Sequence, residues 1–244
     1  MNLARNLVPA VVEIDRVEMG VTPAPHAFSA EERAGIDALY AERLKANPAL
    51  WNGRVLILAE HRFEGDALIG RYSECDYAAL LWLLGAPASH SRLRNGFAMG
   101  ALRGADGAFV MARMAPWTAN AGRVYFAAGT PDLSDVTTDG RVDLEGSLLR
   151  EFSEETGIPA SDVALTAGWT ALVDARRIAL MRQIVAREPA DAVAARIRAF
   201  IAREPRPEID EVIIVRGPVD VPEAVPVFLR TYLAAVWERE GTRV

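Results

Sequence analysis

The alternation of hydrophobic and polar residues predicts both strands and helices in the first part of the chain. The predicted elements are a strand, a helix, two further strands and a short apolar helix, over residues 11–21, 29–45, 55–59, 67–72 and 76–84. Ser29, followed three residues later by Glu32, is a capping-box sequence and marks the start of the first helix. That helix is expected to end near Lys45, before Pro48.

A stretch of small and polar residues at 87–94 separates this part from a different succession of elements. Those elements are strands over 97–102, 109–114 and 124–128, a helix over 144–156, a hairpin over 168–186, a helix over 190–202, a strand over 212–215 and a helix over 225–240. Residues 104–107 favour a tight hairpin turn, and Gly157 is typical of a helix stop. Because strands and helices do not alternate regularly, the pattern favours an α+β fold over a doubly wound sheet. We expect an N-terminal accessory α/β region, residues 1–94, and a second domain, residues 95–244.

Composition and charge exclude several classes of protein. The 244 residues are 51% hydrophobic and 25% charged, the balance of a globular protein that can bury a sizeable core. The one cysteine, Cys75, excludes an internal disulfide framework. The net charge of −6 argues against a nucleic-acid partner, and no apolar run approaches the roughly 20 residues that span a bilayer. We therefore expect a cytoplasmic protein with no membrane or nucleic-acid partner, and the sequence leaves its oligomeric state open.

Three glutamates in the predicted helix over 144–156 are the main candidates for chemistry. Glu151, Glu154 and Glu155 stand at positions i, i+3 and i+4, so their carboxylates share one helix face. Like charges at this spacing repel one another, and a hard cation such as Mg²⁺ offsets the repulsion because it takes carboxylate oxygens as ligands. The spacing alone leaves a second interpretation open, an ordinary solvated acidic face.

The order of residues around these glutamates resembles the second half of the Nudix box, whose full pattern is G-x5-E-x7-R-E-U-x-E-E-x-G-U with U a bulky apolar residue. All seven specified positions of that half match, at Arg150, Glu151, Phe152, Glu154, Glu155, Gly157 and Ile158. The resemblance implies a Nudix α-β-α sandwich with a mixed sheet from about residue 95, and Mg²⁺ or Mn²⁺ as the cofactor. It also implies hydrolysis of a small-molecule nucleoside diphosphate linked to another group.

The resemblance also implies roles for individual residues. Glu154 and Glu155 would be metal ligands, and Glu151 would be a further ligand or the base that activates water. Arg150 would hold the loop and a glutamate in orientation, and a main-chain carbonyl near Ala128 or Gly129 would complete the metal shell. Some family members recruit an additional acid from beyond the box, for which the candidates here are Glu208, Asp210 and Glu211. Those three residues have an alternative interpretation as an ordinary polar strand entry.

The first half of the box departs from the family pattern. Val142 stands where the family has its first glutamate, and Val136 stands where it has a glycine. The loop before the helix is therefore predicted to be lengthened, with Gly129 near its start. Asp143 lies at the predicted N-terminus of the helix, where negative charge is favoured, and is expected to cap the helix or to pair with Arg150 in place of the missing glutamate.

The N-terminal region is similar in layout to that of Nudix diphosphatases that cleave UDP-glucose and UDP-galactose. The similarity rests on residues 51–53 (Trp-Asn-Gly), on an apolar strand and on residues 71–72 (Arg-Tyr). It implies a UDP-sugar as substrate, with a CoA derivative, ADP-ribose or a binding module without catalysis as alternatives. The polar groups available to contact the substrate belong to Asn52, Arg71, Tyr72 and Arg113, of which Arg71 and Arg113 are the predicted substrate-binding residues. Each of the four has the alternative interpretation of an ordinary surface residue.

Other residues carry weaker signals. His26, His61 and His90 lack the spacing of metal ligands, and Cys75 is expected to be a partly buried small residue. Neither a P-loop nor a nucleophile elbow is present in the sequence. Trp117 is a candidate for stacking on a base, although a half-buried hairpin aromatic is the other interpretation.

Overall fold

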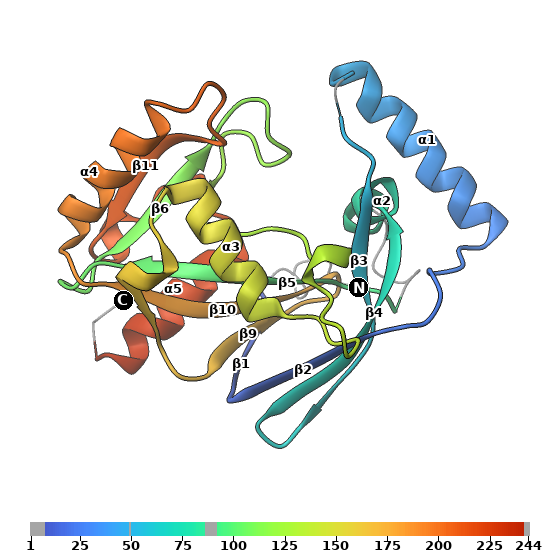
Figure 1. Cartoon of the computed structure of the whole chain (residues 1–244), viewed down its shortest axis with the longest axis horizontal. Coiled ribbons are helices and arrows are strands. Elements are labelled where there is room, and N and C mark those ends of the chain that lie inside the picture. The colour runs from blue at the N-terminus through green and yellow to red at the C-terminus, as the bar shows by residue number, and fades with distance from the viewer. Residues whose placement is uncertain (1–7, 49, 86–91, 242–244) are drawn as a thin grey trace.

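A computed structural model describes residues 8–48, 50–85 and 92–241 of the chain. In this part of the chain the larger sheet has the order β1-β9-β10-β5-β6-β11, with β7 beside β6 and β8 beside β10 (Figure 1). Its strands are β1 (Ala10–Ile14), β5 (Asn95–Arg103), β6 (Phe109–Met114), β7 (Val124–Tyr125), β8 (Val163–Leu165), β9 (Trp169–Val173), β10 (Arg177–Ala186) and β11 (Ile209–Val215). The pair β5–β10 is parallel, whereas β1–β9, β9–β10 and β6–β11 are antiparallel, so the sheet is mixed.

Helices cover both faces of this sheet. On one face α3 (Leu144–Thr156) and α4 (Ala190–Ile201) bury their apolar residues against the strands. On the other face α5 (Val227–Arg239) packs through an aromatic-rich cluster. Short 3-10 turns at Leu133–Asp135, Ala160–Asp162 and Pro218–Asp220 complete the helical elements of the described chain. The structure therefore confirms the α+β class and the α-β-α arrangement of layers.

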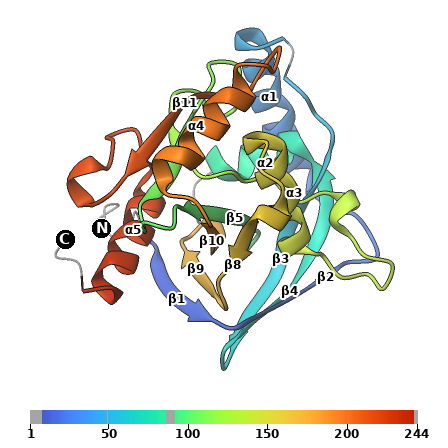
Figure 2. The same cartoon turned by 60° about the vertical axis from the view of Figure 1, so that its left-hand side comes forward.

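The N-terminal region forms a second, three-stranded sheet, which we call the N-terminal sheet. Its order is β2 (Arg16–Val21), β4 (Ala67–Asp76) and β3 (Arg54–Glu64), with β2 parallel and β3 antiparallel to β4. Two helices, α1 (Ala30–Ala46) and α2 (Tyr77–Gly85), pack against one part of it in a small core of their own. The view in Figure 2 shows this sheet on the side of the molecule that carries α3. The capping box of Ser29 and Glu32 is present at the start of α1, as predicted.

The predicted single strand over 11–21 is wrong, because the structure breaks it into two. Asp15 and Arg16 both turn their backbone N–H groups toward the carbonyl oxygen of Asp66, at 2.8 and 3.2 Å, and the chain changes direction there. Strand β1 then pairs with β9 of the larger sheet, whereas β2 pairs with β4 of the N-terminal sheet. The first strand thus crosses the predicted division at residue 94, and part of the stretch 87–94 lies outside the described residues.

The remaining boundaries differ from the predictions mainly in strand length. Strand β7 is confined to Val124–Tyr125, and β3 and β11 are longer than their apolar stretches suggested. The turn between β9 and β10 lies where it was predicted, with the Asp174 carboxylate accepting hydrogen bonds from the backbone of Arg176 and Arg177. Length is the least predictable property because backbone pairing extends a strand through residues of either polarity.

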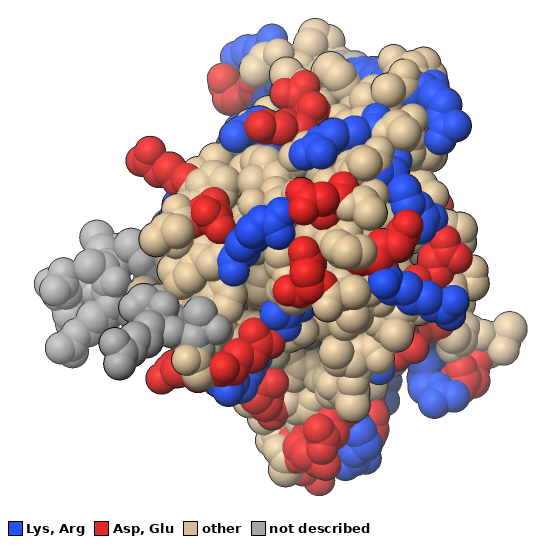
Figure 3. Space-filling model, turned by 90° about the vertical axis from the view of Figure 1, so that its left-hand side faces the viewer, with Lys and Arg blue, Asp and Glu red and all other residues tan. Residues whose placement is uncertain are grey.

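The surface and the helices bear on charge and on membrane spanning. On the face shown in Figure 3 acidic and basic side chains are interspersed, and no broad area carries one sign of charge. Within the described residues, no helix combines the length and the apolar character needed to cross a membrane.

Candidate active site on helix α3

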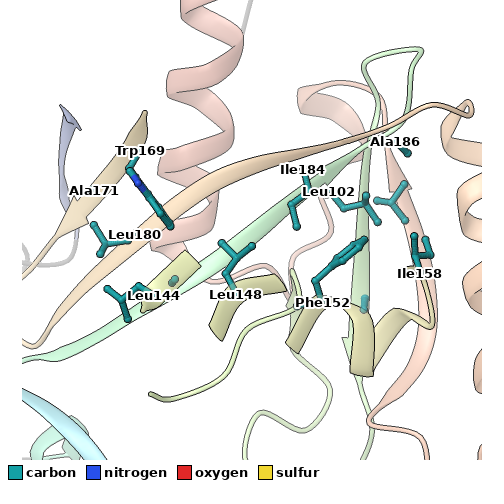
Figure 4. Packing of buried hydrophobic residues seen from close by; sticks show 14 of the residues in the cluster. Leu102, Leu144, Leu148, Phe152, Ile158, Trp169, Ala171, Leu180, Ile184 and Ala186 are labelled. Atoms are coloured by element: carbon teal, nitrogen blue, oxygen red, sulfur yellow. The ribbon is translucent and has the colours of Figure 1, made fainter. Parts of the chain in front are cut away.

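Helix α3 is fixed at both ends and along one face. At its start the Asp143 carboxylate accepts a hydrogen bond of 2.9 Å from the backbone N–H of Gly146, which confirms Asp143 as the N-cap. At its end Gly157 adopts a left-handed conformation with φ of 68°, next to the ring of Phe200. Between them Leu148 and Phe152 are buried against β5 and β10 (Figure 4). This docking turns the face with the three glutamates away from the sheet.

We call Glu151, Glu154 and Glu155 the acid face of α3. The guanidinium of Arg150 lies beside it, and its Nη1 donates to Glu151 Oε1 at 2.7 Å and to Glu154 Oε2 at 3.3 Å. Its Nη2 donates to Asp135 Oδ1 at 3.1 Å. One arginine therefore links two glutamates of the helix to the loop that precedes it.

Asp135, rather than Asp143, is the loop carboxylate that pairs with Arg150, so the predicted pairing with Asp143 is wrong. The Asp135 side chain is only 4% exposed, and its second oxygen accepts from the backbone N–H of Asp132 at 3.1 Å. A buried carboxylate with a guanidinium and a backbone donor is well satisfied, so it holds the guanidinium in place. Sequence reasoning missed Asp135 because counting back from the box assumes a loop of family length, and its signal was the local Asp132–Asp135 capping pattern.

Residues 128–129 lie directly against the acid face. A Cβ atom on Gly129 would come within 2.3 Å of the Glu151 carboxyl carbon, so a glycine is needed for this close approach. The backbone N–H of Ala128 donates to Glu155 Oε1 at 3.3 Å. The structure thus brings the predicted metal-binding residues Gly129, Glu151 and Glu155 together.

The carboxyl group of Glu155 is the most perturbed group of the acid face. Burial raises its pKa to about 8, and the negative charges of Glu208 and Glu151 add to the rise. Burial also raises the pKa of Glu151, although the adjacent Arg150 opposes the rise. The side chain of Glu154 is 61% exposed and lies at the rim. Among the described residues no lysine or arginine pairs with Glu155, so nothing there compensates the charge of its ionised form.

The oxygen ligands of this site fit a hard divalent cation, but the side chains are not arranged as a complete coordination site. Among the residues that the structure describes, no group of three or more His, Cys, Asp or Glu side chains is arranged to hold a metal ion. The physical reason is that Glu151 and Glu154 both turn toward Arg150. Carboxylates crowded around a backbone turn are nevertheless the oxygen ligands that Mg²⁺ and Mn²⁺ prefer.

Of the three acids proposed from beyond the box, Glu208 lies nearest the site. Its charge acts directly on Glu155, and its backbone carbonyl accepts from the N–H of Ala115 at 2.8 Å. Glu211 is instead paired with Arg113 at 2.8 Å across β11 and β6. Asp210 is exposed on the same strand.

The candidate substrate-contacting residues of the N-terminal region lie in different surroundings. Arg71 lines a cavity of about 720 Å³, which we call the sheet cavity, bounded by residues 18–21, 60–62, 69–71 and 139–141. None of the three glutamates of the acid face lines it. Within the described chain no acidic side chain pairs with Arg71.

Asn52 and Tyr72, the other two polar candidates of that region, have structural roles. The Asn52 side chain accepts from the backbone N–H of Ala78 at 2.8 Å, at the start of α2. Tyr72 is fully buried at 0% exposure, so its hydroxyl cannot reach a substrate. The polar groups of both residues were visible in the sequence, whereas the burial of Tyr72 was not.

The residues with weaker signals are dispersed. His61 lines the sheet cavity, His26 packs edge-on against Phe28, and His90 lies outside the described residues. Cys75 is buried, which raises the pKa of its thiol to about 12. Trp117 is 41% exposed, which makes it more accessible than a core aromatic.

Backbone hydrogen bonds near both ends anchor the loop between residues 129 and 142 to the N-terminal sheet. Leu56 of β3 donates its backbone N–H to the Pro131 carbonyl at 2.8 Å. Val142 donates its backbone N–H to the Met19 carbonyl of β2 at 2.9 Å. Asp135 lies between these anchors, so the N-terminal sheet helps to position the carboxylate that holds Arg150.

Comparison with known proteins gives likenesses among solved structures alone. No protein-family model matches the chain, and no curated protein matches it. The crystal structure of the MutT protein from Methanosarcina mazei Go1 is similar with 18% identity and a TM-score of 0.39, over 62% of this chain and 98% of that one. That of RenU, a Nudix hydrolase from M. smegmatis, is similar with 17% identity and a TM-score of 0.37, over 61% of this chain and 86% of that one. The function proposed below rests on the side chains of α3.

Proposed function

We propose that this protein is a metal-dependent Nudix hydrolase that cleaves the diphosphate of a nucleoside diphosphate linked to another group. The observation that carries the proposal is the acid face of α3. Glu151 and Glu155 lie against residues 128–129 with Glu154 at the rim, and the half-buried Glu155 has no cationic partner in the described chain. Burying like charges together is costly unless a cation compensates them, so the arrangement favours a divalent metal site.

Each residue of the site has a role in this proposal. Glu155 and Glu154 would hold Mg²⁺ or Mn²⁺, with Glu151 as a third ligand or as the base and the carbonyl of Gly129 as a further oxygen donor. A bound cation would neutralise the diphosphate and lower the pKa of a water molecule. Glu151 and Glu154 would leave Arg150 to become ligands, and Asp135 would keep the guanidinium in position because it is buried beside it.

We propose a UDP-sugar as the substrate, cleaved to a nucleoside monophosphate and a sugar 1-phosphate. Carboxylates and a cation recognise the diphosphate but discriminate little between the groups attached to it, so specificity depends on other polar contacts. Arg71 in the sheet cavity is free to supply one such contact. Arg113 is committed to Glu211 and would have to exchange that carboxylate for a substrate group.

The test is hydrolysis of UDP-glucose, ADP-ribose, diadenosine polyphosphates and CoA, offered together at equal concentration with Mg²⁺ or Mn²⁺, with both phosphorus products identified. We expect preferential cleavage of UDP-glucose, and loss of turnover when EDTA removes the metal. A preference for CoA or ADP-ribose would overturn the UDP-sugar assignment and leave the Nudix chemistry intact.

A second candidate function is a Nudix-fold module that binds a nucleotide without cleaving it. The observation that favours it is the pairing of Glu151 and Glu154 with Arg150, which withdraws two carboxylates from a metal. Binding of a substrate with metal present, combined with no turnover, would support this alternative against hydrolysis.

A further inference from the structure

Two loops meet at the end of the sheet where β6 finishes and β11 begins (Figure 1). The first carries Trp117 and the second carries Arg206. The backbone hydrogen bond from Ala115 to the Glu208 carbonyl joins the loops, and Ile209, the next residue, lines a small cavity together with Phe152 and Thr156 of α3. Each of the two side chains is two residues from this bond, a span of at most about 7 Å. The pair therefore lies on the rim of the candidate metal site.

The side chains of the pair have the chemistry of a stacking surface. The indole of Trp117 is 41% exposed, whereas Trp169 and Trp237 are 7% and 4% exposed in the cores. The guanidinium carbon of Arg206 lies 5.6 Å from the centre of the indole ring. In the described part of the chain no carboxylate pairs with Arg206, so its donors are available to a ligand.

We propose that Trp117 and Arg206 form the nucleobase-binding surface of the enzyme, with the base stacked on the indole and the guanidinium contributing to the same stack. This inference rests on the proposed function, since a diphosphate held at the acid face places the attached nucleoside within reach of its rim. An exposed indole binds any nucleobase through its aromatic face, and a planar guanidinium adds donors for the base edge or ribose. The other end of the substrate would then point toward the N-terminal sheet and Arg71.

The direct test measures binding of UMP, AMP and ribose 5-phosphate to the full chain with Mg²⁺ by calorimetry. We expect Trp117→Ala to weaken the binding of UMP and AMP by about tenfold, because stacking contributes roughly that factor in affinity per base. Affinity for ribose 5-phosphate should not change, and Trp117→Phe should retain most of the wild-type affinity. Trp51→Ala is the matched control, since Trp51 is 58% exposed but stacks near Tyr77 in the N-terminal region.

Arg206 is tested by two substitutions. We expect both Arg206→Ala and Arg206→Lys to weaken the binding of UMP and AMP. Alanine removes the guanidinium, and lysine keeps the charge but loses the planar group. Full rescue by lysine would assign Arg206 a purely electrostatic contact and overturn its place in the stack.

Kinetics separate this inference from the proposed function. Trp117→Ala should raise KM for the nucleotide substrate and leave kcat nearly unchanged, since stacking is the same in the ground and transition states. Hydrolysis with an unchanged KM in Trp117→Ala, or wild-type binding of UMP and AMP no tighter than that of ribose 5-phosphate, would overturn the nucleobase surface alone. Absence of hydrolysis, combined with loss of UMP and AMP binding in Trp117→Ala, would overturn the proposed function alone.

Discussion

The sheet cavity and the acid face of α3 differ in how their charges are compensated. Around the cavity most charged groups pair locally, as Arg141 does with Asp139 at 2.7 Å and Glu18 with Arg16 at 2.9 Å. On the acid face Glu151 and Glu154 share one guanidinium, and the half-buried Glu155 has none. The cavity offers space with balanced charge, whereas the acid face offers concentrated negative charge in little space. We therefore base the proposed metal site on the like charges of the acid face, and not on the volume of the sheet cavity.

Removing one carboxylate from the acid face should have the largest effect. We expect Glu155→Gln to lower kcat/KM by about 100-fold or more, because several kcal/mol of transition-state stabilisation depend on the cation. Without metal at neutral pH the same variant should melt at a higher temperature, by about 2–4 °C for each kcal/mol gained, since folding no longer has to raise the pKa of this carboxyl group. Kinetics and thermal melts with and without Mn²⁺ measure both effects. Wild-type activity in Glu155→Gln would show that Glu155 is not a ligand of the catalytic metal.

The loop carboxylate should have the next largest effect. We expect Asp135→Asn to lower activity by about 10- to 100-fold, since Arg150 loses the buried carboxylate that fixes the position of its guanidinium beside the acid face. Asp143→Ala is the control, because it removes a helix cap and should cost about 0.5–2 kcal/mol of stability with a smaller loss of activity. Equal losses of activity in the two variants would contradict the view that Asp135 orients Arg150 whereas Asp143 only caps the helix.

Close approach of the backbone to the acid face can be tested at Gly129. A Cβ atom there would collide with the Glu151 side chain, so we expect Gly129→Ala to displace it and lower kcat by about tenfold. Gly217→Ala is the matched control, since no atom lies within 4 Å of the added carbon and the backbone there is extended. Steady-state kinetics of the two variants, with circular dichroism to check the fold, decide the point. Equal activity of both would mean that Glu151 has room to move.

The smallest predicted effect lies in the sheet cavity. We expect Arg71→Ala to raise KM for UDP-glucose by about fivefold with little change in kcat, because an exposed charge contact contributes about 1 kcal/mol. Arg62→Ala is a suitable control, since Arg62 lines the same cavity but pairs with Glu64 at 3.0 Å. An unchanged KM in Arg71→Ala would show that Arg71 in the sheet cavity does not contact the substrate.

The sequence predicted the elements whose signals are local. The bounds of α3 were predicted correctly because Asp143 caps it and Gly157 ends it. The split between β1 and β2 was missed because the apolar pattern continues through Asp15, and the break depends on the distant carbonyl of Asp66.

The candidate site was predictable to the same extent. The spacing of the glutamates within one helix places them on a common face whatever the rest of the chain does. The capping pattern of Asp132 and Asp135 signals a turn but does not pair Asp135 with Arg150, because the loop is positioned by anchors at Leu56 and Met19 of the N-terminal sheet. The burial of Tyr72 depends likewise on packing between parts of the chain that are far apart in sequence.

Anomalous diffraction from crystals soaked in Mn²⁺ tests the central claim most directly. The account predicts a peak at the acid face, bounded by Glu151, Glu154, Glu155 and the backbone of Gly129, with Glu151 and Glu154 turned away from Arg150. It also predicts that this peak is lost in Glu155→Gln. A peak among the acidic residues of the sheet cavity, or a peak at the acid face that persists unchanged in Glu155→Gln, would contradict the assignment of the metal site to helix α3.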